Sequence, residues 1–115
     1  MIIGYARVST SDQDASLQID ALESAKCERI YIEKQSGKNK DRPKLNRCLD
    51  SLREGDQLIV WRLDRLGRSL KDLVDIVNEL ELKSVGFQSL NESIDTTSPT
   101  GKLIFHVFAA LAEFE

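Results

Sequence analysis

Residues 2–10 read IIGYARVST, and they open with a short apolar run that contains β-branched residues. Such a run predicts a buried β-strand over residues 2–8. Ser11 or Asp12 can then cap a helix that extends to about residue 25. A strand followed directly by a helix is the first half of a βα unit, and the chain after it alternates in the same way.

The rest of the chain sets the expected fold class. Strand patterns that alternate with amphipathic helix patterns imply βα crossovers. We therefore expect an α/β fold with a largely parallel, four- or five-stranded sheet and helices on both faces. Gly55 is the expected stop of the helix that begins at Pro43. The predicted strands cover residues 29–34, 57–61 and 85–90, and the predicted helices begin at Pro43, Ser69 and Pro99.

Composition excludes several classes of protein. The chain has 115 residues, of which 41% are hydrophobic and 30% charged, with a net charge of −3. These values are typical of one globular domain and not of a disordered chain. Cys27 and Cys48 lack the spacing of a disulfide scaffold or a zinc site. The longest near-apolar run, 103–112, is too short to span a membrane, and residues 1–10 lack the charged start and apolar run of a signal peptide. We expect a cytoplasmic protein without a membrane partner.

The positive charge is concentrated in two segments. Residues 34–47 carry a balance of +5 and residues 62–71 a balance of +3, so the rest of the chain carries −11. Two interpretations stay open at this point. The segments could face an anion such as a phosphate, or they could be ordinary solvated surfaces.

Polar residues collect where the predicted strands end. In open α/β sheets, ligands bind outside the carboxyl ends of the strands. The segment around Arg42 can approach this edge, and Arg68 precedes a helix N-terminus, where backbone amides favour anions. The residues expected at this edge are Tyr5, Arg7, Ser9, Glu33, Arg42, Arg62, Asp64, Arg65 and Arg68.

Arginines around a hydroxyl suit phosphoryl chemistry, because guanidinium groups hold the oxygens of a phosphate. Ser9 is then a candidate nucleophile. The only histidine, His106, lies in an apolar segment, which argues against a Ser-His-Asp hydrolase. Carboxylates alternate with arginines, so positive side chains would take the place of a metal. Two plainer interpretations remain: Arg7 could pair with Glu33 or Asp64, and Ser9 could only cap a helix.

The last segment is apolar on most of its circumference. A helix of this kind must be buried on more than one face, and a second subunit is the simplest second partner. We therefore predict a dimer formed through residues 100–115; the alternative is a helix that crosses its own core. No helix stop signal follows Glu115, so we expect the chain to be a piece of a longer protein.

Four segments together resemble the serine recombinases, in particular the small resolvases and DNA invertases. The resemblance implies a resolvase-like catalytic core over residues 1–99 and the start of a long dimerisation helix over 100–115. The family's helix-turn-helix DNA-binding domain is absent from this chain. The segments are YARVST (5–10), SGKNKDRP (36–43), LDRLGRS (63–69) and SIDTTSPTGKLIFHVFAALAEFE (93–115).

The resemblance also implies roles for single residues. Ser9 matches the nucleophile that attacks the scissile DNA phosphate and forms a 5′-phosphoserine link. Asp64 matches an acid proposed to assist proton transfer at the leaving 3′ oxygen or to order the arginines. Arginines around the phosphate are matched by Arg7, Arg42, Arg65 and Arg68, and supporting positions by Tyr5, Gln13, Gln18, Glu33 (where Asp is more usual) and Glu115.

The implied reaction is DNA strand exchange by transesterification, which needs no ATP, metal or other cofactor. The implied partners are double-stranded DNA at a crossover site, a second copy in a dimer that pairs into a tetramer, and accessory proteins. We expect little or no recombination by this chain unaided, because the family's DNA-binding domain and the rest of its long helix are absent, and the net negative charge agrees with weak DNA affinity. One alternative is a non-catalytic dimerisation or binding module of the same fold. Another is a flavodoxin-like phosphoryl-transfer enzyme, although the chain has no Walker or GxGxxG loop.

Overall fold

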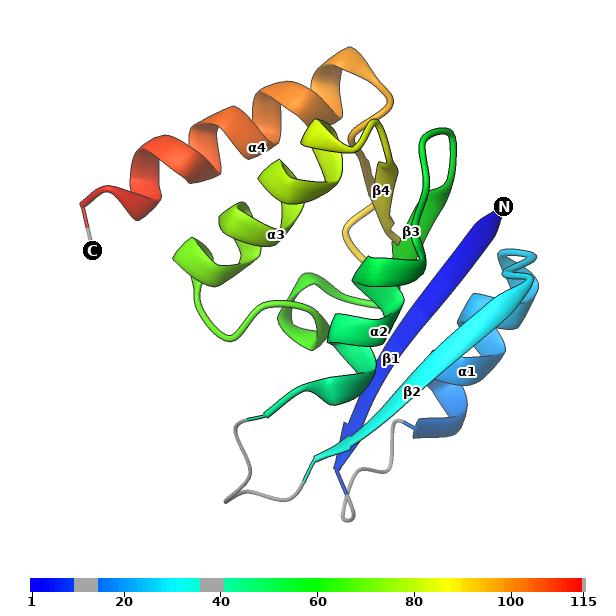
Figure 1. Ribbon diagram of the computed structural model, residues 1–115. Helices are drawn as coiled ribbons and strands as arrows, with labels where there is room; N and C mark the ends of the chain where they lie inside the picture. Colours follow the sequence, from blue (N-terminus) through cyan, green and yellow to red (C-terminus); the bar gives the residue numbers. More distant parts are fainter. Residues whose placement is uncertain (10–14, 36–40, 115) are drawn as a thin grey trace.

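Five strands pair into one sheet in the computed structural model, which describes residues 1–9, 15–35 and 41–114 (Figure 1). The strands are β1 (Ile2–Ser9), β2 (Arg29–Gln35), β3 (Gln57–Val60), β4 (Gly86–Ser89) and β5 (Ile94–Asp95). Their order across the sheet is β2-β1-β3-β4-β5. The first four are parallel, and β5 runs antiparallel to β4. The predicted, largely parallel sheet is confirmed, with five strands.

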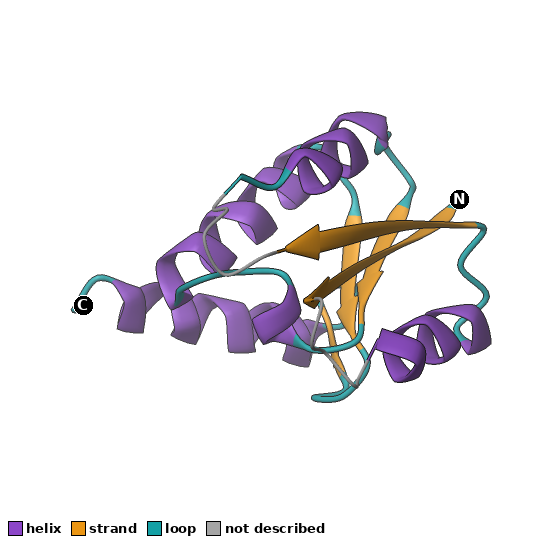
Figure 2. Ribbon diagram, turned by 90° about the horizontal axis from the view of Figure 1, so that it is seen from below, coloured by secondary structure: helices purple, strands orange, loops and turns teal. Residues whose placement is uncertain are grey.

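Helices cover both faces of this sheet, as predicted (Figure 2). The helices that begin at Pro43, Leu70 and Pro99 pack on one face, and the helix over residues 15–24 packs on the other. A short 3-10 turn, η1 (Leu63–Arg65), follows β3. The four helices are α1 (Ala15–Ser24), α2 (Pro43–Ser51), α3 (Leu70–Leu82) and α4 (Pro99–Ala112).

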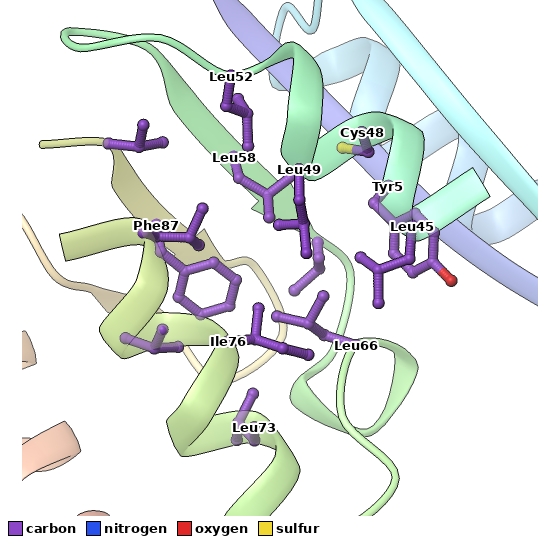
Figure 3. Packing of buried hydrophobic residues seen from close by; sticks show 14 of the residues in the cluster. Tyr5, Leu45, Cys48, Leu49, Leu52, Leu58, Leu66, Leu73, Ile76 and Phe87 are labelled. Atoms are coloured by element: carbon purple, nitrogen blue, oxygen red, sulfur yellow. The ribbon is translucent and has the colours of Figure 1, made fainter. Parts of the chain in front are cut away.

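Alternation along β1 distributes its side chains between two cores, because successive residues of a strand face opposite sides. Ile3 and Tyr5 belong to the larger core, where Tyr5 lies beside Leu45 (Figure 3). Ala6 belongs to the smaller core, together with Leu22 of α1. Arg7 comes two residues after Tyr5, so it lies on the same face of the sheet as Ile3 and Tyr5. It is closer to the end of the strand than either of them.

Three predicted helix boundaries need comment. Ser69 caps α3, since its Oγ accepts a hydrogen bond from the backbone N–H of Asp72 at 3.0 Å. The helix that begins at Pro43 ends at Ser51, four residues before Gly55, so the predicted stop was wrong. Gly55 instead takes a φ of +89° in the turn before β3, a conformation that favours glycine. The predicted cap at Ser11 or Asp12 lies outside the described residues.

Helix α4 presents one apolar face to the core and another to the surface. The ring of Phe105 is buried and meets that of Phe87 edge-to-face, with centroids 5.7 Å apart. On the outer face, Leu103, Val107 and Leu111 are 62%, 49% and 51% exposed. No helix in the described ranges is both long and apolar enough to cross a membrane.

Candidate active site

The carboxyl ends of β1, β2 and β3 bring the predicted residues to one edge of the sheet. In the parallel register of β1 and β2, Arg7 lies opposite Glu33 and Ser9 opposite Gln35. On the other side of β1, Tyr5 lies opposite Val60, the last residue of β3. Three residues after Val60 the chain enters η1, which carries Asp64 and Arg65. Residues 50 or more apart in sequence are thus neighbours here.

Arg7 is half-buried at this edge, and its Nη2 donates a hydrogen bond to the backbone carbonyl of Asp64. The contact is to the carbonyl and not to the carboxylate, so it is not the buried salt bridge considered as an alternative. Nη1 of Arg7 is buried and has no hydrogen-bond partner in the part of the chain that the structure describes. Arg7 therefore keeps a donor for a ligand.

Burial has the largest effect on the pKa of Arg7, and two neighbouring cations act in the same direction. Burial lowers the pKa of the Arg7 guanidinium, and the nearby Arg42 and Arg65 lower it further, against the opposing effects of Tyr5 and Asp64. Arg42 and Arg65 are therefore each close enough to repel the charge of Arg7. An anion placed between them would relieve this repulsion.

Gln18 of α1 supports the backbone at Arg7. Its side chain is fully buried, and its Nε2 donates to the carbonyl oxygen of Arg7 at 3.0 Å. The contact joins α1 to the end of β1 from the face opposite the larger core.

Glu33 is buried and caps the N-terminus of α2. Its Oε1 accepts hydrogen bonds from the backbone N–H groups of Lys44 at 3.0 Å and Leu45 at 3.2 Å. The hydroxyl of Tyr5 donates to the same oxygen at 3.5 Å. Burial, and then the charge of Glu33, raises the pKa of Tyr5 above its usual value. A carboxylate at the first amides of a helix satisfies donors that have no intrahelical partner.

Asp72 is a site residue that sequence reasoning missed. Its Oδ2 accepts from Arg42 Nη1 at 2.9 Å, and its Oδ1 accepts from Arg42 Nη2 at 3.2 Å. Oδ2 also accepts from the backbone N–H of Arg68 at 2.9 Å. Burial alone would raise the pKa of Asp72, but the hydrogen bonds from Arg42 and Arg68 outweigh it and hold the pKa below its usual value. The spacing Ser69-x-x-Asp72, a capping pattern, was the available sequence signal.

Arg42 connects the basic segment to the rest of the site. It stands just before α2, and its side chain is 11% exposed. Besides Asp72, its Nη1 donates to the carbonyl oxygen of Leu66 at 3.0 Å. The side chain of Arg42 is therefore held between the turn that follows η1 and the first turn of α3.

The remaining predicted residues come from the segment that follows β3, and two of them lie at the rim of the site. Asp64 and Arg68 are exposed, and both line a pocket of about 280 Å³ at the start of α3. Arg65 is half-buried next to Arg7. Arg62 lies over the ring of Trp61, with its Cζ 4.4 Å from the ring centroid. The pocket is lined by Leu63, Asp64, Gly67, Arg68, Ser69, Leu70 and Leu73.

Residues 2–115 match the protein family described as "Resolvase, N terminal domain". This chain belongs to the resolvase family of serine recombinases. The serine recombinase gin of Escherichia phage Mu is 55% identical over 115 residues, which are all of this chain and 60% of that protein. The DNA-invertase of Escherichia phage P1 is 54% identical over 115 residues, 62% of its length. The chain thus spans about three-fifths of the curated relatives it matches.

Solved structures agree with the family assignment. The N-terminal catalytic domain of TP901-1 integrase superposes with a TM-score of 0.83 at 31% identity, over 98% of this chain and 94% of that one. A resolvase family site-specific recombinase from Streptococcus pneumoniae shares the fold, with a TM-score of 0.78 at 22% identity. The non-catalytic module considered as an alternative is not favoured by these comparisons.

Three serine recombinase residues expected from the resemblance need separate mention. The backbone of Ser9 forms the last residue of β1, paired in register with Gln35. Gln13 and Glu115 lie outside the described residues. The described part of the site therefore brings together Tyr5, Arg7, Gln18, Glu33, Arg42 and Arg65, with Asp64 and Arg68 at the rim.

Proposed function

We propose that this chain is the catalytic domain of a site-specific recombinase that cuts and rejoins DNA with Ser9 as its nucleophile. In the cleavage step, the Ser9 oxygen bonds to the scissile phosphorus and the bond from phosphorus to the 3′ oxygen breaks. The serine proton is given up, and the leaving 3′ oxygen gains one. Rejoining reverses the step on a new 3′ hydroxyl. Each step exchanges one phosphate ester for another, so no energy source is consumed.

The observation that carries the proposal is the gathering of guanidinium groups at the carboxyl end of β1, the strand that ends in Ser9. Arg42 and Arg65 each lie near enough to Arg7 to lower the pKa of its guanidinium. Arg7 also keeps a buried Nη1 without a partner among the described residues. A phosphate with developing negative charge is the ligand that such a group stabilises best.

The other predicted residues have proposed roles around this group. The hydrogen bond from Arg7 to the Asp64 carbonyl favours a role for the Asp64 turn in ordering the arginines. Arg68, at the rim, would hold a phosphate oxygen from the solvent side. Tyr5, Gln18 and Glu33 would support the strand ends, while roles for Gln13 and Glu115 rest on the family resemblance alone.

The partners and the cellular location of the protein are also part of this proposal. The exposed apolar stripe of Leu103, Val107 and Leu111 on α4 supports a dimer with a second copy, formed through residues 100–115. Double-stranded DNA at a crossover site would be the substrate, and dimers would pair into a tetramer, with accessory proteins controlling the pairing. Residues 1–99 would form the catalytic core. Phage and transposon relatives favour action on DNA in the bacterial cytoplasm.

A covalent-capture experiment tests the proposal. This chain replaces the matching 115 residues of the phage P1 DNA-invertase, and the chimera receives that invertase's own DNA site with a nick, in EDTA. We expect an SDS-resistant adduct that maps to Ser9 and is lost in Ser9→Ala. The unaltered phage P1 protein is the positive control. An adduct with that protein, but none with a folded, DNA-bound chimera, would refute the proposal.

A further inference from the structure

We propose that Asp72 is a positioning residue that fixes the guanidinium of Arg42 in the phosphate-binding group; this inference rests on the proposed function above. The two residues are 30 positions apart in sequence, on the segment before α2 and in the first turn of α3. Both oxygens of the Asp72 carboxylate accept from Arg42, at 2.9 and 3.2 Å. A bidentate pair of this kind sets the orientation of a guanidinium as well as its location.

Three donated hydrogen bonds hold the Arg42 side chain in place. An arginine has five N–H groups. Three of those on Arg42 are used by Asp72 and by the Leu66 carbonyl. These are both N–H groups of Nη1 and one N–H group of Nη2. The protein thus fixes the guanidinium of Arg42 by contacts with two separate segments, the turn after η1 and the first turn of α3.

Electrostatics explain why Arg42 needs this restraint. Arg42 lies within electrostatic reach of Arg7 and of Tyr5. Before DNA binds, nearby cations repel Arg42, and a free arginine side chain samples many rotamers. The Asp72 carboxylate offsets the repulsion and removes that freedom. Without it, the guanidinium would move toward solvent, and the site would have to reorder it during each reaction.

The Asp72 carboxylate is itself held rigidly. Ser69 Oγ accepts from the Asp72 N–H at 3.0 Å, and Asp72 Oδ2 accepts from the Arg68 N–H at 2.9 Å. The preceding turn is closely packed, because a Cβ atom on Gly67 would lie 2.8 Å from Leu73 Cβ. Asp72 therefore sets the location of Arg42 relative to the backbone that carries Arg68.

The experiment is a double-mutant cycle in the chimera described above. The rate of Ser9 adduct formation is measured under single-turnover conditions for Asp72→Asn, Arg42→Ala and the double variant, with DNA affinity and Tm for each. We expect Asp72→Asn to slow adduct formation at least ten-fold with unchanged DNA affinity. The double variant should be no slower than Arg42→Ala, because Asp72 acts through Arg42. Asp72→Glu, which retains the charge, should recover part of the rate. Asp75→Asn, at an exposed position of α3, is the matched control.

Three results would overturn the inference. An unchanged rate in Asp72→Asn, measured well below its Tm, would show that the pair is only structural. Additive losses in the double variant would show that Asp72 does not act through Arg42. A faster rate would show that Asp72 withholds Arg42 from the reaction.

A second measurement separates this inference from the proposed function. In this chain alone, NMR of the arginine side chains should show slow rotation of the Arg42 guanidinium, and fast rotation in Asp72→Asn. Fast rotation in both would refute the positioning role. If the unaltered chimera forms no adduct while the Arg42 signal behaves as expected, the proposed function fails and the positioning contact stands.

Discussion

Glu33 Oε1 accepts a hydrogen bond from the backbone N–H of Lys44 at 3.0 Å, so a carboxylate at the end of β2 caps the start of α2. The same oxygen accepts from Leu45 N–H, and the Glu33 side chain is almost fully buried. A buried carboxylate is stable only where donors replace its lost water. Here the helix amides supply them, and Glu33 in turn anchors the segment that begins at Arg42.

Glu33→Ala should destabilise the fold, because it leaves two helix amides and the Tyr5 hydroxyl without their acceptor. We expect a loss of about 1–3 kcal/mol in the free energy of unfolding, measured by urea denaturation. Lys34→Ala, at the exposed neighbouring position, is the control and should change stability little. Equal effects of the two substitutions would contradict the capping role.

The ion pair of Asp72 should make stability depend on acid pH. The folded pKa of Asp72 lies below its unfolded value, so the pair stabilises the fold above about pH 4, the ordinary range of aspartate, and this contribution is lost as pH falls through the folded pKa. Asp72→Asn should therefore cost about 1–2 kcal/mol at pH 7. The difference from the unaltered chain should shrink toward zero in acid. A pH-independent difference, in urea titrations at several pH values, would rule this out.

Gly101→Ala should be strongly destabilising. A Cβ atom at this position would lie 1.8 Å from the carbonyl oxygen of Asp95, which belongs to the backbone of β5. The first turn of α4 would have to move off the sheet, at a cost of about 2–3 kcal/mol or more. Thermal unfolding of Gly101→Ala and of Thr100→Ala, an exposed position in the same turn, measures this cost. Similar Tm values for the two would show that α4 shifts freely.

Arg65→Ala and Arg68→Ala should abolish Ser9 adduct formation in the chimera while the protein stays folded. Both residues lie in the segment after β3, where Arg65 lowers the pKa of Arg7 and Arg68 lines the pocket. Circular dichroism and the adduct assay together check this expectation. If either substitution mainly lowers Tm and leaves the adduct yield intact, that arginine is structural.

Replacement of the exposed stripe on α4 should dissociate the proposed dimer. Leu103, Val107 and Leu111 lie one turn apart and face outward, so the triple change to Gln removes apolar contact area but little of the core packing. Sedimentation of the chimera should show a dimer, and of the triple variant a monomer. Lys71→Gln, an exposed position of α3, is the control and should stay dimeric. A monomer before substitution would contradict the dimer.

The Cys48 thiol should resist labelling in the native protein. Its side chain is fully buried, and burial raises its pKa to about 12, so almost no thiolate forms at neutral pH. A thiol reagent at pH 8 should modify Cys48 only after denaturation, as mass spectrometry of tryptic peptides will show. Rapid native labelling would indicate that α2 opens readily.

Local pattern determined the order of elements in this protein. Each of these patterns lies within a single strand or helix, so it can be recognised from the sequence alone. They are the apolar run at 2–8, the i, i+3, i+4, i+7 spacing of Leu45 to Leu52, and the cap at Ser69. The short elements η1 and β5 were not predicted, because two or three residues carry no periodicity. The residue types and the strand-end location of the candidate site followed from the same pattern.

Only the tertiary structure decided which polar groups pair. From the sequence, Arg7 could pair with Glu33 or Asp64; in the fold, Glu33 caps α2 and Arg7 contacts the Asp64 carbonyl. The partner of Arg42 proved to be Asp72, which sequence reasoning had not placed in the site. A hydrogen bond depends on distances of a few tenths of an ångström between segments that meet only when the sheet closes. Periodicity specifies the faces of each element, but the packing of one element against another sets those distances.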